Sequence, residues 1–400
     1  DYGNTRNSVS ETRGEEFTYT IDNLLTYNKT FNRHSIDALL GTSWMREYYR
    51  YMTNSTINDL GGTDITGFQN EDGKISAGDS NAALLSFFAR VNYDYDNKYL
   101  LSLSIRRDES SKFHKDNRVG YFPSVSAGWN VHQEKWFQNP VMSKLKIRAS
   151  YGELGANFLN PYNFDAIAYG PIPYTVGGER YVTGRAAYLK SKDLKWETAK
   201  TTDIGIELGF FNNDLTLSLD YFVKKNVDLL AQIDLNLSSG QIFEINSSRE
   251  KPYVNTASVK NTGWEFMMNY RKQLTKDFHI DATFNIATLK NKVLSLGENV
   301  QPITSGAMSS YFNDAASITM PGEAIGSFYG YKIDGFDAEG NFIFADTDKN
   351  GVVNANDKVI LGSPIPDFPY GLTITLEYQD FDLTVFFQGV QGNDIFNPKK

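Results

Sequence analysis

The main pattern in this chain is a strict alternation of apolar and polar residues, repeated in many short segments. From Leu215 to Tyr221 (LTLSLDY) every odd residue is apolar and every even residue is polar. The same pattern occurs at residues 145–151, 204–210, 264–270, 278–286, 372–378 and 381–387. A helix would need apolar spacings of three and four, so the pattern predicts β-strands with one apolar and one polar face.

The connections between the expected strands alternate between short and long. Asp96-Asn97, Asn212-Asn213 and Gln379-Asp380 have the composition of tight hairpin turns, and residues 28–32 and 272–276 form slightly longer ones. Long polar segments lie between these hairpins, at about residues 47–82, 108–119, 152–200, 225–253 and 289–367. We count about twelve strands, with every second connection short.

This asymmetry of the connections is typical of one fold class. Outer-membrane barrels have short periplasmic turns, long extracellular loops, and strands that alternate between a lipid-facing and a lumen-facing side. The sequence therefore predicts an all-β, transmembrane, antiparallel up-and-down β-barrel. A large soluble β-sandwich with aromatic edges is the alternative, but it gives no reason for long loops to gather at one end.

Polar residues on the expected inner face indicate a wet or filled lumen. The alternation places Arg90, Asn92 and Asp94 of one strand on this side, and Lys144, Lys146 and Arg148 of another. Such residues are tolerated only where the barrel interior holds water or a polar domain.

Composition narrows the possible partners. The mean hydropathy is −0.42, and no apolar run reaches the length that a transmembrane helix requires. The net charge of −9 argues against nucleic acid, because phosphate binding requires clustered basic residues. The chain contains no cysteine and begins in the middle of the pattern, so we expect residues 1–400 to be part of a longer barrel protein.

Several collinear segments resemble the SusC/RagA-type TonB-dependent transporters of Bacteroidetes. They are residues 92–101 (NYDYDNKYLL), 106–113 (RRDESSKF), 120–129 (GYFPSVSAGW), 145–152 (LKIRASYG), 194–198 (LKWET), 209–213 (GFFNN), 326–331 (GSFYGY) and 364–371 (PIPDFPYG). The resemblance covers nearly the whole chain.

The resemblance implies a barrel of roughly twenty-two strands in the bacterial outer membrane, of which this chain would form about twelve. A plug domain, a TonB box and the last strands would lie outside it. It also implies a SusD-like surface lipoprotein as partner, energy coupling through TonB-ExbB-ExbD, and import of glycans or peptides. A passive porin and a structural or adhesive barrel remain the alternatives.

Residues 346–357 (DTDKNGVVNAND) have the spacing of a calcium-binding loop. Candidate ligands are the side chains of Asp346, Asp348, Asn350, Asn354 and Asp357 and the carbonyl group of Val352. Gly351 stands where such loops turn sharply. Asp357 replaces the usual glutamate, and the loop resembles the dockerin type. The alternative is an Asp/Asn/Gly turn without a metal.

The remaining candidates are aromatic. Tyr162, Tyr169, Tyr174 and Tyr181 lie in a long connection and could stack on sugars or peptides, or could pack the loop against its neighbours. The four histidines are far apart, and the sequence contains no nucleophile elbow, Walker loop or dinucleotide fingerprint. The sequence therefore favours a transporter that is not an enzyme and that needs no organic cofactor.

Overall fold

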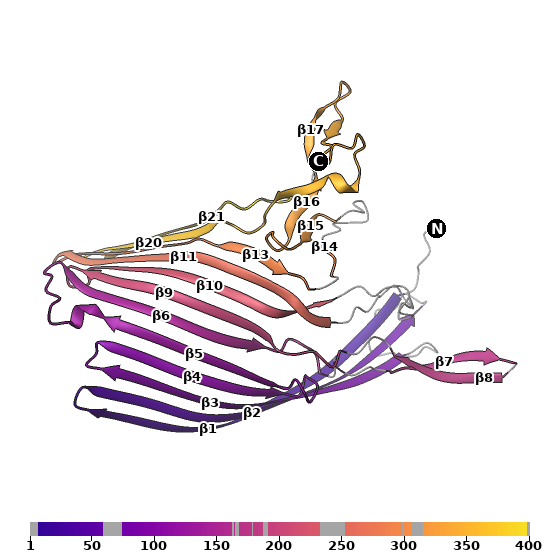
Figure 1. Cartoon of the computed structure of the whole chain (residues 1–400), viewed down its shortest axis with the longest axis horizontal. Helices are drawn as coiled ribbons and strands as arrows, with labels where there is room; N and C mark the ends of the chain where they lie inside the picture. Colours follow the sequence, from indigo (N-terminus) through magenta and orange to yellow (C-terminus); the bar gives the residue numbers. More distant parts are fainter. Residues whose placement is uncertain are drawn as a thin grey trace.

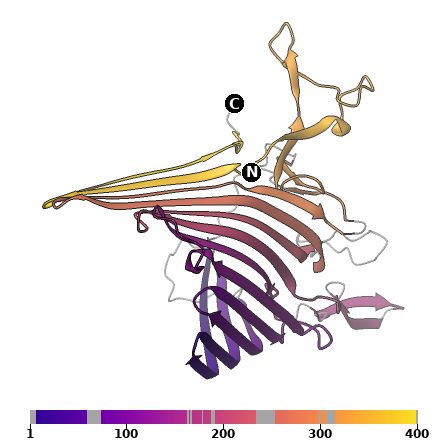
Figure 2. The ribbon, with the colours of Figure 1, turned by 60° about the vertical axis from the view of Figure 1, so that its left-hand side comes forward.

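The computed structural model describes residues 7–58, 74–161, 164, 168–177, 179–186, 191–232, 253–297, 300–305 and 315–397. Its main feature is one large antiparallel sheet in which twelve strands follow each other along a single path. They are β1 (Asn7–Phe31), β2 (His34–Asn58), β3 (Lys74–Tyr95), β4 (Tyr99–Ser110), β5 (Val119–Asn130), β6 (Met142–Ala156), β9 (Glu197–Phe210), β10 (Leu215–Gln232), β11 (Tyr253–Thr275), β12 (Phe278–Ala287), β20 (Phe368–Tyr378) and β21 (Phe381–Gln391). The sheet curves between its first and last strands (Figure 2).

The short connections lie at one end of this sheet and the long ones at the other (Figure 1). The tight turns depend on residues that tolerate a left-handed backbone: φ is +57° at Asp96, +54° at Asn97 and +70° at Asn213. The predicted alternation of short and long connections is thus present. One short-side connection, residues 131–141, is longer than the others and contains the 3-10 helix η1 (Val131–Gln133).

The predicted loop at residues 47–82 is wrong in extent. β2 continues to Asn58 and β3 already begins at Lys74, so most of this segment is strand. Arg50, for example, is the register partner of both Glu15 on β1 and Asp79 on β3. Alternation indicates a strand only where the two faces of that strand meet different surroundings. Here the strands continue through polar sequence, where backbone pairing and cross-strand side-chain contacts such as Arg50–Glu15 maintain them.

The long connections fold back and pack on the large twelve-stranded sheet, which is called the wall below. One buried cluster joins the connection after β4, the connection after β6 and the wall; it consists of Phe113, Phe122, Leu159, Leu194 and Trp196. A second buried cluster joins β11 to β13 (Lys290–Ser295), which pairs with β11; it consists of Ala257, Val259, Val293 and Leu296. These clusters hold parts of the connections at defined positions.

The longest connection, between β12 and β20, builds its own small sheets above the wall (Figure 1). A four-stranded sheet contains β14 (Ile303–Ser305), β15 (Ser317–Thr319), β16 (Ser327–Tyr331) and β19 (Lys358–Gly362). A hairpin of β17 (Ile333–Phe336) and β18 (Phe342–Phe344) lies beside residues 346–357, and η3 (Ala355–Asp357) closes that segment. A separate hairpin of β7 (Ala168–Val176) and β8 (Glu179–Ala186) belongs to the connection between β6 and β9.

Among the described residues, no helix has the length and apolar character needed to cross a membrane.

Candidate lumen wall and metal-type loop

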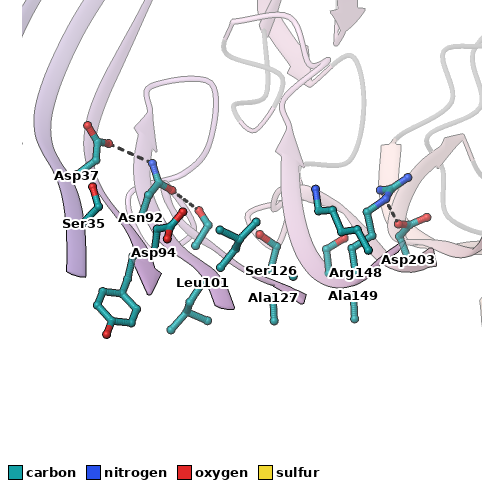
Figure 3. Close-up of a pocket in the computed structure, with 16 residues that line it drawn as sticks. Ser35, Asp37, Asn92, Asp94, Leu101, Ser126, Ala127, Arg148, Ala149 and Asp203 are labelled. Atoms are coloured by element: carbon teal, nitrogen blue, oxygen red, sulfur yellow. Dashed lines mark hydrogen bonds and ion pairs between the residues drawn. The ribbon is translucent and has the colours of Figure 1, made fainter. Parts of the chain in front are cut away.

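The two faces of the wall differ in chemistry. In Figure 3 the side chains of Asp37, Asn92 and Ser126 point to one side of the sheet, whereas those of Leu101 and Ala127 point to the other. This alternation comes directly from the sequence pattern, because successive side chains of a strand point to opposite faces. The polar face lines a cavity of about 500 Å³ across β2 to β9.

Hydrogen bonds link the polar side chains from strand to strand. Asn92 donates to Asp37 Oδ1 (3.1 Å), and the Ser102 hydroxyl donates to Asn92 Oδ1 (2.6 Å). Asp37, Asn92 and Ser102 are register partners on adjacent strands, so the row follows the sheet's own pairing. Water or a polar solute can form further hydrogen bonds with such a row of side chains, or can take the place of one partner in an existing hydrogen bond.

An ion cluster continues this face across β6, β9 and β10. The Arg148 guanidinium lies 3.3 Å from Asp203, 3.4 Å from Glu207 and 2.6 Å from Asp220. Glu207 also pairs with Lys144 at 2.7 Å and Lys146 at 3.5 Å. The cluster therefore balances three carboxylates with three cations.

The register explains why the cluster needs a glycine. Gly205 lies opposite Arg148 on β6 and Asp220 on β10. A Cβ atom at Gly205 would lie 1.8 Å from Asp220 Oδ1. The missing side chain leaves the space in which the guanidinium reaches a carboxylate that is only 6% exposed.

The predicted inner-face residues agree with this geometry. Asn92, Asp94, Lys146 and Arg148 line the cavity, and Arg90 lies two residues before Asn92 on the same strand. Lys144 belongs to the ion cluster through its ion pair with Glu207. The acidic side of the ion cluster was not predicted, although Asp203, Glu207 and Asp220 occupy polar positions of the alternating pattern. Their proximity depends on which strands are neighbours.

The metal-type loop brings its three acidic residues together. Ligand atoms of Asp346, Asp348 and Asp357 all lie within 4.8 Å of one another. The backbone N–H of Gly351 donates to Asp346 Oδ2 (2.7 Å), and that of Asn350 donates to Asp348 Oδ1 (3.1 Å). These bonds curl the chain around the carboxylates.

Asp357 holds the two ends of this loop together. The backbone N–H groups of Thr347 (2.7 Å) and Asp348 (3.2 Å) donate to its Oδ1 atom, and that of Asn354 (2.8 Å) donates to Oδ2. The Asn354 hydrogen bond is the main reason that the pKa of Asp357 lies below its usual value, because these donors favour the ionised form. Asp357 is fully buried in the chain.

Two further loop features match a calcium-type turn. Gly351 has φ of +88° and Lys349 has φ of +59°, so the chain reverses sharply between the first and last acidic residues. The Val352 carbonyl accepts a hydrogen bond from the Asn354 side chain (3.0 Å), and the Asn350 side chain accepts one from the Val352 N–H (2.9 Å). Oxygen atoms at this spacing suit a hard cation.

The predicted aromatic residues are only partly within the described structure. Tyr162 lies outside the described residues. Tyr169 and Tyr174 fall on β7 and Tyr181 falls on β8, where Tyr174 and Tyr181 are register partners. The backbone thus brings three of the four predicted tyrosines into one hairpin beyond the wall.

Comparison with known proteins agrees with this architecture. Residues 1–397 match the family model described as TonB dependent receptor-like, beta-barrel. The chain is 33% identical to TonB-dependent receptor P3 of Formosa agariphila over 99% of its own length and 40% of the relative's. It is 32% identical to TonB-dependent receptor SusC of Bacteroides thetaiotaomicron over 78% of this chain and 32% of that protein.

A solved structure titled as the RagAB peptide transporter has the same fold, with a TM-score of 0.78 over 96% of this chain and 42% of that one, at 21% identity. The chain thus spans 40% or less of the two relatives' lengths. Nothing in this family membership calls for enzymatic chemistry. Its strands, its two chemically distinct faces and its relatives lead to one conclusion: the chain belongs to the β-barrel family of TonB-dependent receptors of the bacterial outer membrane.

Proposed function

We propose that the chain forms the wall of an active outer-membrane importer for oligosaccharides or peptides. The observation that carries this proposal is the contrast between the two faces: one is apolar, and the other is a hydrogen-bonded polar row continued by the ion cluster. A polar inner face suits passage of a polar cargo, and the apolar face suits lipid. The names of the SusC and RagAB relatives support a SusC/RagA-type importer.

The proposed importer works with two partners. A SusD-like surface lipoprotein would sit at the end that carries the long connections, and TonB-ExbB-ExbD would act from the periplasm through a region N-terminal to the barrel. Energy coupling distinguishes this machine from a passive porin, which conducts without it.

Uptake and conductance together test the proposal. Cells that express the full-length protein should take up labelled oligosaccharide or peptide, and uptake should stop when a protonophore removes the proton-motive force. Liposomes that contain the same protein should not swell in small sugars. Swelling without an energy source would instead establish the porin, and absence of both signals would favour a structural or adhesive barrel.

We also propose that residues 346–357 bind Ca²⁺ and that the ion braces an extracellular connection. The support is the convergence of the Asp346, Asp348 and Asp357 carboxylates. The oxygen atoms of Asn350, Val352 and Asn354, which the ligand spacing adds as candidates, accept hydrogen bonds within the loop. The hydrogen-bonded turn without a metal is the competing explanation, because Asp357 already accepts several loop donors.

Calorimetry separates these two explanations. The full-length protein should bind Ca²⁺ with a dissociation constant of about 10⁻⁴–10⁻³ M, as in extracellular modules. The double substitution Asp346→Ala and Asp348→Ala should abolish the heat change. Asp334→Ala, an exposed acidic residue of the neighbouring hairpin, is the matched control and should bind normally. No heat change in the unaltered protein at millimolar Ca²⁺ would establish the metal-free turn.

A further inference from the structure

The first three strands of the wall are much longer than the two that follow them. β1 and β2 have 25 residues each and β3 has 22, whereas β4 and β5 have 12 each. β4 pairs with β3 only from Leu84 onward, so residues 74–83 of β3 extend beyond it. This additional length lies at the end of the sheet that carries the long connections (Figure 1).

Two groups of aromatic rings on the outer face mark the lipid boundaries. The group near the short connections is a row of register partners that contains Phe31, His34, Tyr95, Tyr99 and Trp129. The other group contains Tyr19, Trp44 and Tyr48, with ring centroids 5.4 and 6.4 Å apart.

The distance between the two groups matches the thickness of a bilayer core. Trp44 lies ten residues beyond His34 on β2, a path of about 34 Å and, at the usual tilt, about 26 Å of membrane depth. The apolar band of such barrels is roughly 25 Å tall. Residues 7–16, 49–58 and 74–80, which we call the overhang, therefore lie beyond the lipid on the side of the long connections.

Tyr49 and Tyr51 lie on the lumen-side face of the overhang. They follow Asp37 at even spacings on β2, and the register of β2 with β1 and β3 contains no shift, so the three side chains share one face. Figure 3 shows Asp37 on the polar side of the sheet. The two tyrosine ring centroids are 5.9 Å apart, and the ring planes differ by 29°. Tyr49 is 41% exposed and Tyr51 is 38% exposed, so ring surface is available on this face.

Glycines on both neighbouring strands let these rings lie close to the sheet. Gly14 on β1 and Gly78 on β3 are the register partners of Tyr51. A Cβ atom at Gly78 would lie 2.8 Å from the Tyr51 ring, and one at Gly14 would lie 3.2 Å from the Tyr49 hydroxyl oxygen. Each ring therefore covers a glycine position with one side and leaves its other side open. Tyrosine has only two side-chain torsions, so holding it ready for a ligand costs little entropy.

Hydroxyl and carboxylate groups lie beside the two rings. One register row on this face consists of Thr12, Thr53 and Ser76, and the Thr12 and Thr53 hydroxyls share a hydrogen bond of 2.9 Å. The exposed Glu16 is the register partner of Tyr49. An aromatic ring can stack on the C–H face of a sugar, while hydroxyl and carboxylate oxygens accept hydrogen bonds from its hydroxyl groups. A carboxylate at this position disfavours an anionic chain, so the surface suits a neutral one.

We infer that the tyrosine pair of the overhang is a binding platform for a neutral oligosaccharide. Tyr49 and Tyr51 stack on neighbouring sugars of one chain, and Glu16 and the threonine hydroxyls bind its hydroxyl groups. The platform holds the chain outside the membrane, on the face that leads into the lumen. This inference rests on the proposed import and selects oligosaccharides from its two cargo classes.

An array of neutral and acidic oligosaccharides, probed with the full-length protein in detergent, tests the platform. At least one neutral oligosaccharide should bind, and Tyr51→Ala should weaken that binding about tenfold through loss of one stacked ring. Tyr51→Phe keeps the ring and should bind nearly as well as the unaltered protein. Gly78→Ala removes no ligand group, but its methyl group displaces the Tyr51 ring and should also weaken binding.

Tyr48→Ala is the matched control, because it removes a tyrosine from the opposite face of the same strand and should leave oligosaccharide binding unchanged. Heat-modifiable migration on a gel shows that each variant has folded. Binding of acidic oligosaccharides alone, or of none, would overturn the inference. Unchanged binding by folded Tyr51→Ala would also overturn it, because the rings would then only cover the glycines. Loss of a co-purifying surface lipoprotein in Tyr51→Ala, without oligosaccharide binding in the unaltered protein, would assign the face to a protein partner instead.

This outcome is separable from that of the proposed import. Binding in detergent needs no proton-motive force, so a protein that binds the oligosaccharide but fails to import it would retain the platform and lose the proposed function. Energy-dependent uptake by a protein that binds no oligosaccharide on the array would have the opposite meaning.

Discussion

Two groups of three carboxylates, one in the wall and one in the loop, are stabilised in different ways. Asp203, Glu207 and Asp220 meet cations that neighbouring strands supply, above all Arg148. The loop carboxylates at 346, 348 and 357 instead accept hydrogen bonds from backbone N–H groups of their own segment. Neutral donors orient a carboxylate without cancelling its charge, whereas an arginine does both. In the wall, neighbouring cations therefore neutralise the charge of the carboxylates, whereas the loop carboxylates keep a negative charge that a bound cation could neutralise.

Arg148→Met gives the largest expected effect, because it removes the cation and leaves the carboxylates together. We expect a loss of about 1–3 kcal/mol in unfolding free energy, less than for a fully buried pair because Arg148 is partly exposed. Urea unfolding of the full-length barrel in lipid vesicles measures it. Arg50→Met, whose pair with Glu15 is largely exposed, should cost under about 0.5 kcal/mol. Equal losses would remove the distinction between the cluster and a surface ion pair.

Gly205→Ala should break the wall cluster without removing any charge. The new methyl group meets Asp220 Oδ1, so this carboxylate must move away from Arg148. We expect a cost of about 1–2 kcal/mol in the same unfolding measurement. Gly335→Ala in the hairpin, where the added carbon meets nothing, is the control. An unchanged stability in Gly205→Ala would show that Asp220 reaches Arg148 equally well from another rotamer.

Asp357→Asn should loosen the loop and leave the wall intact. The amide keeps one acceptor oxygen, so some backbone donors lose their partner. Amide hydrogen exchange at Thr347 and Asp348 should become about tenfold faster, while exchange in β9 and β10 stays the same. Faster exchange in both regions would mean that the loop and wall do not open independently.

The pH dependence of loop protection should be the smallest effect. Because the folded pKa of Asp357 is lowered, its ionised form stabilises the loop at pH values above the ordinary aspartate range. This stabilisation should be lost as the pH falls through the lowered pKa. Exchange protection at Asn354, corrected for the intrinsic rate, should therefore decrease under acid in the unaltered protein and change less in Asp357→Asn. Identical profiles would assign the acid response to another group.

Local pattern sufficed for most strands of the wall, for their two faces and for the short turns, but not for the full extent of β2 and β3 or for the hairpin of β7 and β8. Alternation reports which residues share a face, so Asn92 and Arg148 could be placed toward the lumen, and Asp96-Asn97 could be placed in a turn. The loop at 346–357 was also visible, because its ligand spacing lies within twelve residues. Ion binding there remains a prediction.

Tertiary structure decided what depends on register and on distant segments. Gly205, Arg148 and Asp220 meet only because β9 lies between β6 and β10, and Trp196 reaches Phe113 only because two long connections fold together. The extension of β2 and β3 was hidden for a related reason. The periodicity of a sequence reflects the different surroundings of the two faces of one strand. Which strands pair, and which loops pack together, produces no periodic pattern in the sequence.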